Sequence, residues 1–243
     1  MHWSDDGLVL GARKHGESSV ILELLTREHG RHLGLVHGWR SKRLQPVLQP
    51  GNTVHAVWRA RLDEQLGTYA VEAGVSRSAR LIGSSLALYG IGAMAALLRL
   101  LPERDPHPAL FDAAAVLLDH LHDAHVAPAL FVRFEITVLA EFGFGLDLAS
   151  CAATGSTEGL TYVSPKSGRA VGAAAAEPYK DRLLALPAFL RSDRGDDGPS
   201  PDDIEAGFAL SEFFLRQHLF EPRGLPLPEE RTRFVALSLR TDA

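Results

Sequence analysis

The first third of the chain alternates short, strand-like segments with glycine turns, and no helical pattern separates them. Five such segments span residues 7–13, 19–26, 31–37, 53–62 and 66–73. Five short strands at this spacing are typical of a small all-β barrel or sandwich. A partly open, five-stranded barrel of the OB type is the economical solution, because closing the sheet removes most of its exposed edges.

Alternation of side chains is clearest in the fourth segment. One face carries Val54, Ala56, Trp58 and Ala60, and the other carries His55, Arg59 and Arg61. This two-residue period predicts a strand that is buried on one side. Between the second and third segments, residues 27–30 have the composition of a turn, in which Gly30 suits a positive φ angle.

A loop after the third segment contains three cations within four residues, Arg40, Lys42 and Arg43. Arg13 and Lys14 lie on a neighbouring element. Residues 1–80 carry 11 Lys and Arg against 8 Asp and Glu, whereas residues 81–150 carry 3 against 8 and the whole chain has a net charge of −5. Because local potential steers association, we expect a polyanion to meet this third of the chain first.

Trp39 precedes these cations, and the role of the loop depends on where the Trp39 ring lies. Two interpretations are possible. In the first, the cations contact phosphates and Trp39 stacks on an unpaired base, as in proteins that bind single strands. In the second, the loop is a solvated surface and Trp39 is tucked into the barrel. The residues alone do not decide between the two.

After residue 74 the pattern changes to that of helices. Apolar residues at three-to-four spacing predict helices over 78–101, 107–123, 128–142, 180–190, 202–220 and 231–239, with a loop at 193–201. Asp202 and Asp203 suit the positive end of a helix. Segment 81–101 is long enough to span a membrane, but its glycines, its serines and Arg99 favour a buried helix. The fold class is therefore α+β, with a barrel followed by a mostly helical bundle.

Catalytic and metal-binding patterns are weak. Asp119, His122 and His125 would share a helical face, but no matching distant ligands stand out, so we interpret this segment as a polar helix end. The chain contains no GxxxxGK[ST], HExxH or GxSxG pattern. Cys151 is the only cysteine and has no basic neighbours in sequence that would lower its pKa. We expect no enzymatic activity, no cofactor and no metal.

The cellular compartment follows from two further observations. A single cysteine allows no intrachain disulfide and fits a reducing environment. Residues 1–6 are polar and acidic, unlike the basic start and apolar core of a signal peptide. We therefore expect a cytoplasmic protein.

Several short motifs occur in a specific order and spacing along the chain. They are GLVL at 7–10, GESSV at 16–20, LT at 25–26, GR at 30–31, GWRSKR at 38–43, LQPG at 48–51, FGFGLDL at 142–148, CAATG at 151–155 and YVSPKSGRAV at 162–171. Together they resemble the RecO family of bacterial DNA repair proteins, and the resemblance covers essentially the whole chain.

This resemblance implies a recombination mediator with a characteristic domain order. The implied domains are an OB-fold DNA-binding domain at 1–76, the first part of a helical bundle at 77–146, a zinc-ribbon-like knuckle at 147–176 and the rest of the bundle at 177–243. Such proteins bind single- and double-stranded DNA, anneal complementary strands and work with RecR. They also engage the C-terminal tail of the single-stranded-DNA-binding protein, help to load RecA, and act at the nucleoid.

The chain departs from the family pattern at the knuckle. Some members bind zinc through two CxxC pairs, whereas here Cys151 matches the first position, Thr154 replaces the second, and residues 164–171 supply no cysteine. We therefore expect a knuckle that persists without metal.

For the partner tail, an acidic peptide with an apolar end requires a hydrophobic groove and a cation. Residues 81–150 offer Arg99, Arg104 and Arg133, of which Arg133 is the candidate because it lies on a predicted helix. The alternative function is a protein–protein adaptor of a repair complex that touches DNA only incidentally, a reading that the net negative charge supports.

Overall fold

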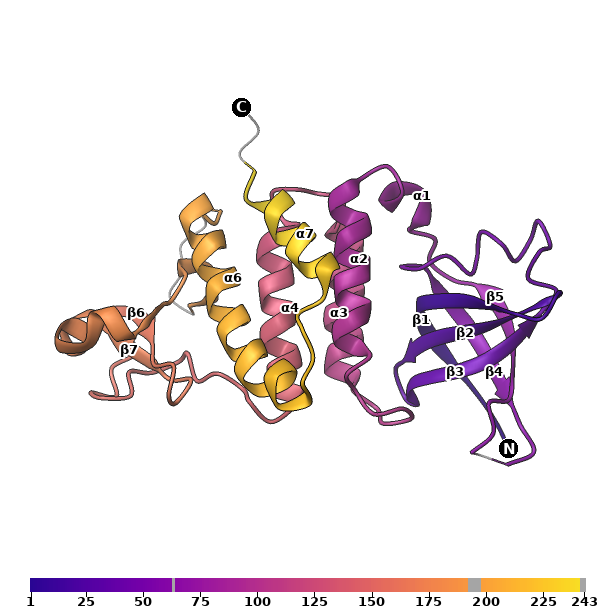
Figure 1. Cartoon of the computed structure of the whole chain (residues 1–243), viewed down its shortest axis with the longest axis horizontal. Coiled ribbons are helices and arrows are strands. Elements are labelled where there is room, and N and C mark those ends of the chain that lie inside the picture. The colour runs from indigo at the N-terminus through magenta and orange to yellow at the C-terminus, as the bar shows by residue number, and fades with distance from the viewer. Residues whose placement is uncertain (63, 192–197, 241–243) are drawn as a thin grey trace. The chain divides into compact units, whose positions relative to one another are not determined.

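The computed structural model describes residues 1–62, 64–191 and 198–240 and divides into two compact units, Met1–Asp123 and Ala124–Ala243. A closed barrel and helices form the first unit, and helices with a small sheet form the second (Figure 1). The predicted α+β class with an N-terminal five-stranded barrel is confirmed. The boundary between the units falls within the predicted segment 77–146, and the four domain ranges remain predictions.

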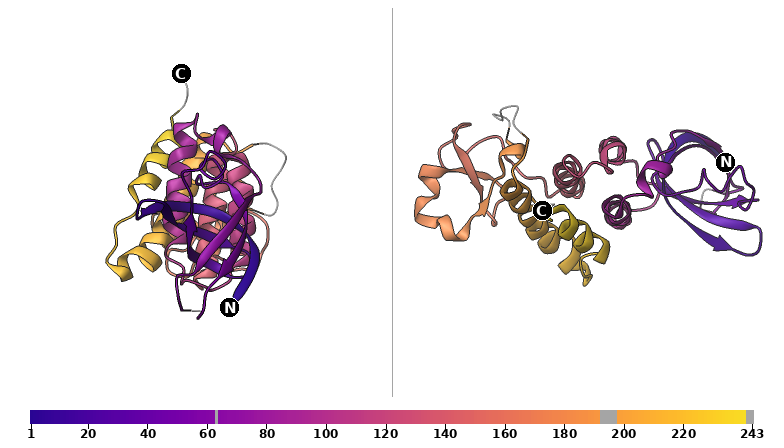
Figure 2. Two further views of the ribbon diagram at one scale, coloured as in Figure 1. Left: turned by 90° about the vertical axis from the view of Figure 1, so that its right-hand side faces the viewer. Right: turned by 90° about the horizontal axis from the view of Figure 1, so that it is seen from above.

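Five strands form the barrel, and their order is β1-β2-β3-β5-β4. Their bounds are β1 His2–His15, β2 Ser19–Thr26, β3 Gly30–His37, β4 Thr53–Arg59 and β5 Thr68–Ala73. All neighbours are antiparallel except β3 and β5, which form a parallel pair at Leu35 and Thr68 that closes the barrel. The views of Figure 2 show the sheet curling closed.

Strand β1 is twice as long as predicted because it pairs with a different neighbour along each half. Its start lies against β4, from His2 opposite Arg59, and its end lies against β2, as far as His15 opposite Ser19. A register shift between Val9 and Gly11 marks the change. Such a bulge bends a strand, which allows β1 to follow the barrel wall.

The alternation of apolar and polar residues in the fourth segment correctly predicts which side chains of β4 lie in the barrel core. Val54, Ala56 and Trp58 are at most 1% exposed, whereas His55 and Arg59 face outward. The inward face of β2 adds Val20, Leu22 and Leu24. Burial of these side chains away from water is the main stabilisation of the barrel.

Gly30 has φ +65°, as the sequence predicted, and a second constraint holds it there. A Cβ atom at this position would lie 2.0 Å from the carbonyl oxygen of Asp105. Residues 103–104 form a parallel bridge beside Arg31, and the Arg104 N–H donates to the Arg31 carbonyl. Glycine is therefore required both by the turn and by the close approach of this second chain segment.

The helical part of the first unit begins with a correction. The predicted continuous helix over 78–101 is two helices, α1 Ser78–Leu81 and α2 Ser85–Leu98. Ser84 caps α2 by accepting a hydrogen bond from the Ala87 N–H, so the chain restarts a helix there. Helix α3 spans Pro108–His120. No helix in the described ranges has the length and apolar character to cross a membrane.

The second unit combines helices with a three-stranded sheet. Its elements are α4 Ala127–Glu141, β6 Leu160–Val163, β7 Ala170–Gly172, α5 Ala173–Ala176, β8 Leu184–Ala185, α6 Pro201–Leu215 and α7 Glu229–Ser238. The sheet order is β7-β6-β8. A π-helical turn, Arg216–Phe220, continues α6. Ser200 and Asp203 form a capping box at the start of α6. This confirms the expected start of that helix and its acidic first turn.

The predicted helix over 180–190 is wrong. This stretch contains the end of a 3₁₀ helix, Glu177–Arg182, followed by strand β8 and a second 3₁₀ turn, Ala188–Leu190. Pro187 removes a backbone donor, and β8 gains partners in β6 that a helix would forgo. Of the predicted loop at 193–201, residues 193–197 lie outside the described part of the chain, and Pro201 begins α6.

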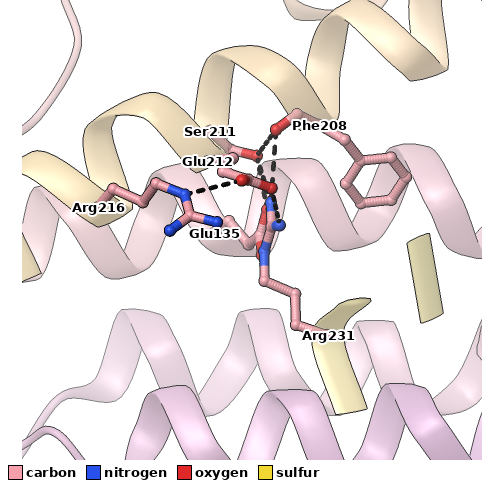
Figure 3. A network of polar contacts seen from close by, with 6 residues as sticks. All are labelled: Glu135, Phe208, Ser211, Glu212, Arg216 and Arg231. Carbon is pink, nitrogen blue, oxygen red and sulfur yellow. Dashed lines mark hydrogen bonds and ion pairs between the residues drawn. The ribbon is translucent and has the colours of Figure 1, made fainter. Parts of the chain in front are cut away.

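A buried ion pair fixes α7 against α4 and α6 (Figure 3). Arg231 is 1% exposed and donates to both carboxylate oxygens of Glu135, at 2.6 and 3.1 Å. Glu212 accepts from the same guanidinium at 2.7 Å, and Ser211 donates to Glu135 at 2.6 Å. Every charge in this cluster has a partner, as burial demands.

Candidate nucleic-acid interface

The cationic loop, residues 38–52, leaves the barrel after β3 and is shaped by turns rather than by a helix. Gly38 has φ +67°, and its N–H donates to Ser18 at 2.9 Å in the neighbouring hairpin. Ser41 then organises a turn, since its carbonyl and its Oγ both accept from the Leu44 N–H. Leu48 is buried in the barrel core and anchors the far side of the loop.

Arg40, Lys42 and Arg43 are exposed on this loop. Across the described residues, no carboxylate forms an ion pair with any of the three. Their charges therefore face solvent without compensation and can release counterions when they meet phosphates.

Trp39 combines features of both sequence interpretations. The ring is half-buried and packs against the barrel core. The Lys14 ammonium and the Arg40 guanidinium lie 5.9 and 5.7 Å from the ring centroid. Its buried indole N–H has no hydrogen-bond partner among the described residues. The barrel holds Trp39 in place while cations flank it.

The side chains of Lys14 and Arg13 lie at different places on the barrel. Lys14 reaches Trp39, whereas Arg13, its neighbour on the alternating strand, lines a separate cavity of about 430 Å³. Arg99 lies in that cavity and is paired with Glu23 at 2.9 Å. The structure thus groups Lys14 with the loop and leaves Arg13 apart from it.

A cleft that the sequence analysis missed lies beside Arg43. It encloses about 510 Å³ between β3, β4 and β5, and Arg43, His37, His55 and Tyr69 are among the residues that line it. Strands β3 and β5, which both contribute to its lining, pair at a single position, Leu35 with Thr68. No local pattern in the sequence reports this closure, because it joins strands that are distant in the chain.

In the second unit, Arg133 lines a cavity of about 470 Å³. Its lining includes apolar Ile136, Leu148 and Leu190 and a second cation, Arg191. Arg133 lies on α4 and is exposed, with one nitrogen donating to the Phe189 carbonyl at 2.6 Å. The structure therefore places the predicted cation next to an apolar groove, the combination that an acidic peptide with an apolar end requires.

The knuckle around Cys151 is held by hydrogen bonds. The Cys151 N–H donates to Ser156 at 2.7 Å, the Gly155 N–H donates back to Cys151 at 2.8 Å, and the Gly172 N–H donates to Sγ at 3.3 Å. Bonds from the Thr154 hydroxyl and the Gly172 N–H lower the pKa of this thiol to about 7. No basic side chain contributes to this shift; the hydrogen-bond donors that lower the pKa are brought to the sulfur by folding.

The histidine segment lies at the end of helix α3, in agreement with its interpretation as a polar helix end, but one geometric detail differs. Helix α3 ends at His120, so His122 and His125 do not share a helical face. Asp119 instead accepts from Arg77 at 2.7 Å, which lowers the pKa of its carboxyl. Within the described ranges no group of three or more His, Cys, Asp or Glu side chains is arranged to hold a metal ion.

Comparison with known proteins identifies the family. The models described as recombination protein O N terminal and C terminal match residues 1–75 and 84–225. A DNA repair protein RecO of Methylobacterium nodulans is 66% identical over 240 residues, which cover 98% of each chain. Its counterparts in Methylorubrum populi and Rhizobium johnstonii are 62% and 55% identical, covering 98% and 99% of this chain and 98% and 93% of theirs. This chain therefore belongs to the RecO family of DNA repair proteins.

Proposed function

We propose that this protein is an ATP-independent mediator of DNA repair and homologous recombination. It binds single- and double-stranded DNA, anneals complementary strands and, with RecR, helps to load RecA onto strands coated by the single-stranded-DNA-binding protein. In this role it needs no cofactor and performs no catalysis, and it works in the cytoplasm at the nucleoid.

One observation carries the DNA-binding part of the proposal. Arg40, Lys42 and Arg43 project from one loop without carboxylate partners among the described residues, and they lie in the one third of the chain with a net positive charge. Contacts to phosphates require charge rather than base identity, so such a loop suits a protein that handles any sequence.

The loop is tested by the triple variant Arg40→Ala, Lys42→Ala and Arg43→Ala. Each lost phosphate contact on a single strand lowers the slope of log affinity against log salt by about 0.7, so we expect the slope to fall by about 2. A matched control removes three exposed cations elsewhere, Lys166, Lys180 and Arg182. Unchanged affinity of the loop variant across a salt series would reject the assignment.

The groove around Arg133 supports a second part of the proposal, that the protein docks the acidic C-terminal tail of the single-stranded-DNA-binding protein. Its apolar lining suits the apolar end of the tail, and Arg133 supplies a cation for the carboxylates of the tail. Arg133→Glu should abolish measurable binding of a tail peptide, whereas Lys166→Glu on the exposed surface should not. Equal affinities for the two variants would remove Arg133 from the site.

An adaptor that binds partners and touches DNA only incidentally is the competing function, favoured by the balance of 3 cations to 8 acidic residues over residues 81–150. A fluorescence assay of single-strand binding and annealing, without ATP and at several salt concentrations, separates the two. A mediator anneals complementary strands in this assay, and an adaptor does not.

A further inference from the structure

The barrel carries a second cavity, of about 340 Å³, that is distinct from the cationic loop. Trp3, Glu28, His29, His32, Trp58 and Arg104 line it. Trp3 is near the start of β1 and pairs with Trp58 on β4. The cationic loop instead begins after His37, which pairs with Ser19 beside the hairpin at the other end of β1. The two features therefore mark opposite ends of the barrel.

Stacked aromatic rings form the wall of this aromatic pocket. Trp3 stacks on His29, with ring centroids 4.2 Å apart and planes 8° from parallel, and on Trp58 at 5.8 Å and 18°. His32 meets both tryptophan rings edge-on. Trp58 and His32 are 1% and 3% exposed, whereas Trp3 and His29 are only half-buried. Trp3 and His29 are consequently the rings that a ligand can reach.

The polar groups of the aromatic pocket include the Glu28 carboxylate, the His32 ring and the Arg104 guanidinium. Glu28 is exposed at the rim, and Asp5 Oδ2 lies 3.1 Å from the His29 ring and accepts from the Glu28 N–H. Burial lowers the pKa of His32 to about 4, so this ring is neutral at neutral pH. The Glu28 carboxylate at the rim can accept a hydrogen bond from the uncharged, N–H-bearing edge of a flat ring, and the neutral His32 ring beneath it adds no charge.

Arg104 completes the pocket in a conformation that few residues adopt. Its φ is +66°, the only positive value at a non-glycine residue in the described chain. Its N–H donates to Arg31 and one guanidinium nitrogen donates to the Gln65 carbonyl at 3.0 Å. These contacts hold the guanidinium 5.9 Å from the Trp58 ring centroid. Backbone strain of this kind concentrates at functional sites, and arginine planes stack on bases as aromatic rings do.

We propose that the aromatic pocket binds one unpaired nucleobase of single-stranded DNA, stacked on His29, which Trp3 supports from behind, beside Arg104. This inference rests on the proposed DNA-binding function and refines it. Bases within a duplex are already stacked and paired, so the aromatic pocket serves single strands only. The cationic loop contacts the phosphates of single-stranded and duplex DNA alike, and the aromatic pocket adds affinity for single strands only. Annealing then releases the base as it pairs.

The test compares two probes, an oligothymidylate and a base-free deoxyribose phosphate chain of equal length and charge. Trp3→Ala and His29→Ala should each lower affinity for the oligothymidylate by about 5- to 150-fold, the usual effect of losing one stacked base. Affinity for the base-free chain and for duplex DNA should not change. Trp3→Phe retains a ring and should preserve most of the binding. Tyr89→Ala removes an exposed aromatic ring on α2 and is the control.

Loss of the barrel fold in Trp3→Ala would be seen in the circular dichroism spectrum, and His29→Ala then carries the test because His29 lies in a surface turn. The aromatic pocket is rejected if both probes weaken equally, or if neither variant changes the ratio of their affinities. Failure of the DNA-binding function itself is different, because wild-type protein would then bind neither probe at any salt concentration.

Discussion

Glu135 is a carboxylate on a helix whose neighbouring residues are buried, and Arg231 is the cation that allows it to remain charged there. The two side chains are 0% and 1% exposed and lie nearly a hundred residues apart in sequence. Charges removed from water are tolerated only when each hydrogen-bonding group is satisfied. Glu212 and Ser211 complete that requirement (Figure 3).

Arg231→Met should therefore destabilise the protein by about 3 to 5 kcal/mol, because Glu135 is left buried without a partner. The double variant Glu135→Leu, Arg231→Met should recover most of that loss, since it removes both charges. Urea unfolding measures these differences. Arg233→Met on the exposed side of α7 is the control and should cost under about 0.5 kcal/mol. A cost for Arg231→Met no larger than that control would contradict the argument.

His32 makes the stability of the barrel depend on pH. Burial, followed by the nearby Arg104 charge, lowers its pKa from 6.5 to about 4. The unfolded chain binds a proton at this position below pH 6.5, but the folded chain does not until about pH 4. The stabilisation is therefore complete above pH 6.5 and is lost as the pH falls from 6.5 to 4, by about 3 kcal/mol in all.

A His32→Gln variant should lack this part of the pH dependence. Between pH 7 and pH 4 the unfolding free energy of the wild-type protein should fall by about 3 kcal/mol more than that of the variant. Parallel curves would show that His32 does not titrate as the structure implies.

At the scale of elements, the knuckle after α4 is held to its neighbours by backbone hydrogen bonds. The Ala152 N–H donates to Ala170 at 2.8 Å, which joins the knuckle to β7, and the Gly172 N–H occupies one position around the Cys151 sulfur. Strand β8 adds a third strand to this sheet from outside the predicted range 147–176.

We expect the purified, untagged protein to contain no stoichiometric zinc, and its melting temperature to be the same with and without a chelator. One thiolate with backbone donors around it does not provide the four ligands of a structural zinc site. Elemental analysis together with thermal unfolding checks this. Stoichiometric zinc that raises the melting temperature would show that ligands other than cysteine hold a metal.

At the scale of the whole molecule, the candidate DNA sites and the candidate site for the partner tail lie in different compact units. The cationic loop and the aromatic pocket belong to Met1–Asp123, and the Arg133 groove belongs to Ala124–Ala243. Within the first unit the net positive charge belongs to residues 1–80, with 11 Lys and Arg against 8 Asp and Glu, whereas Met1–Asp123 as a whole carries 13 of each.

The two activities should therefore be separable by mutation. The triple loop variant is expected to bind the tail peptide with wild-type affinity, and Arg133→Glu is expected to bind bare DNA as the wild-type protein does, because sites that share no residues contribute independently. Fluorescence anisotropy with each ligand measures both. A variant that weakens both ligands alike would indicate that the sites are coupled.

Much of this architecture is a local property of the sequence. The two-residue period placed Val54, Ala56 and Trp58 inside the barrel, Gly30 in its turn, and the cations on a loop, because these features depend on neighbours within a few residues. The prediction of a helix over 180–190 was wrong for the opposite reason. Strand β8 forms there because it pairs with β6, a distant segment that local propensity does not take into account.

Only the tertiary structure decided what depends on strand register and on contacts between distant segments. The parallel pairing of β3 with β5, the stacking of Trp3 on His29, and the pairing of Glu135 with Arg231 join residues separated by 26 or more positions. Their partners are fixed by closure of the barrel and by packing of helices, for which the sequence carries no local period. The sequence by itself therefore determined the elements and the charged loop, and folding alone brought the aromatic pocket together.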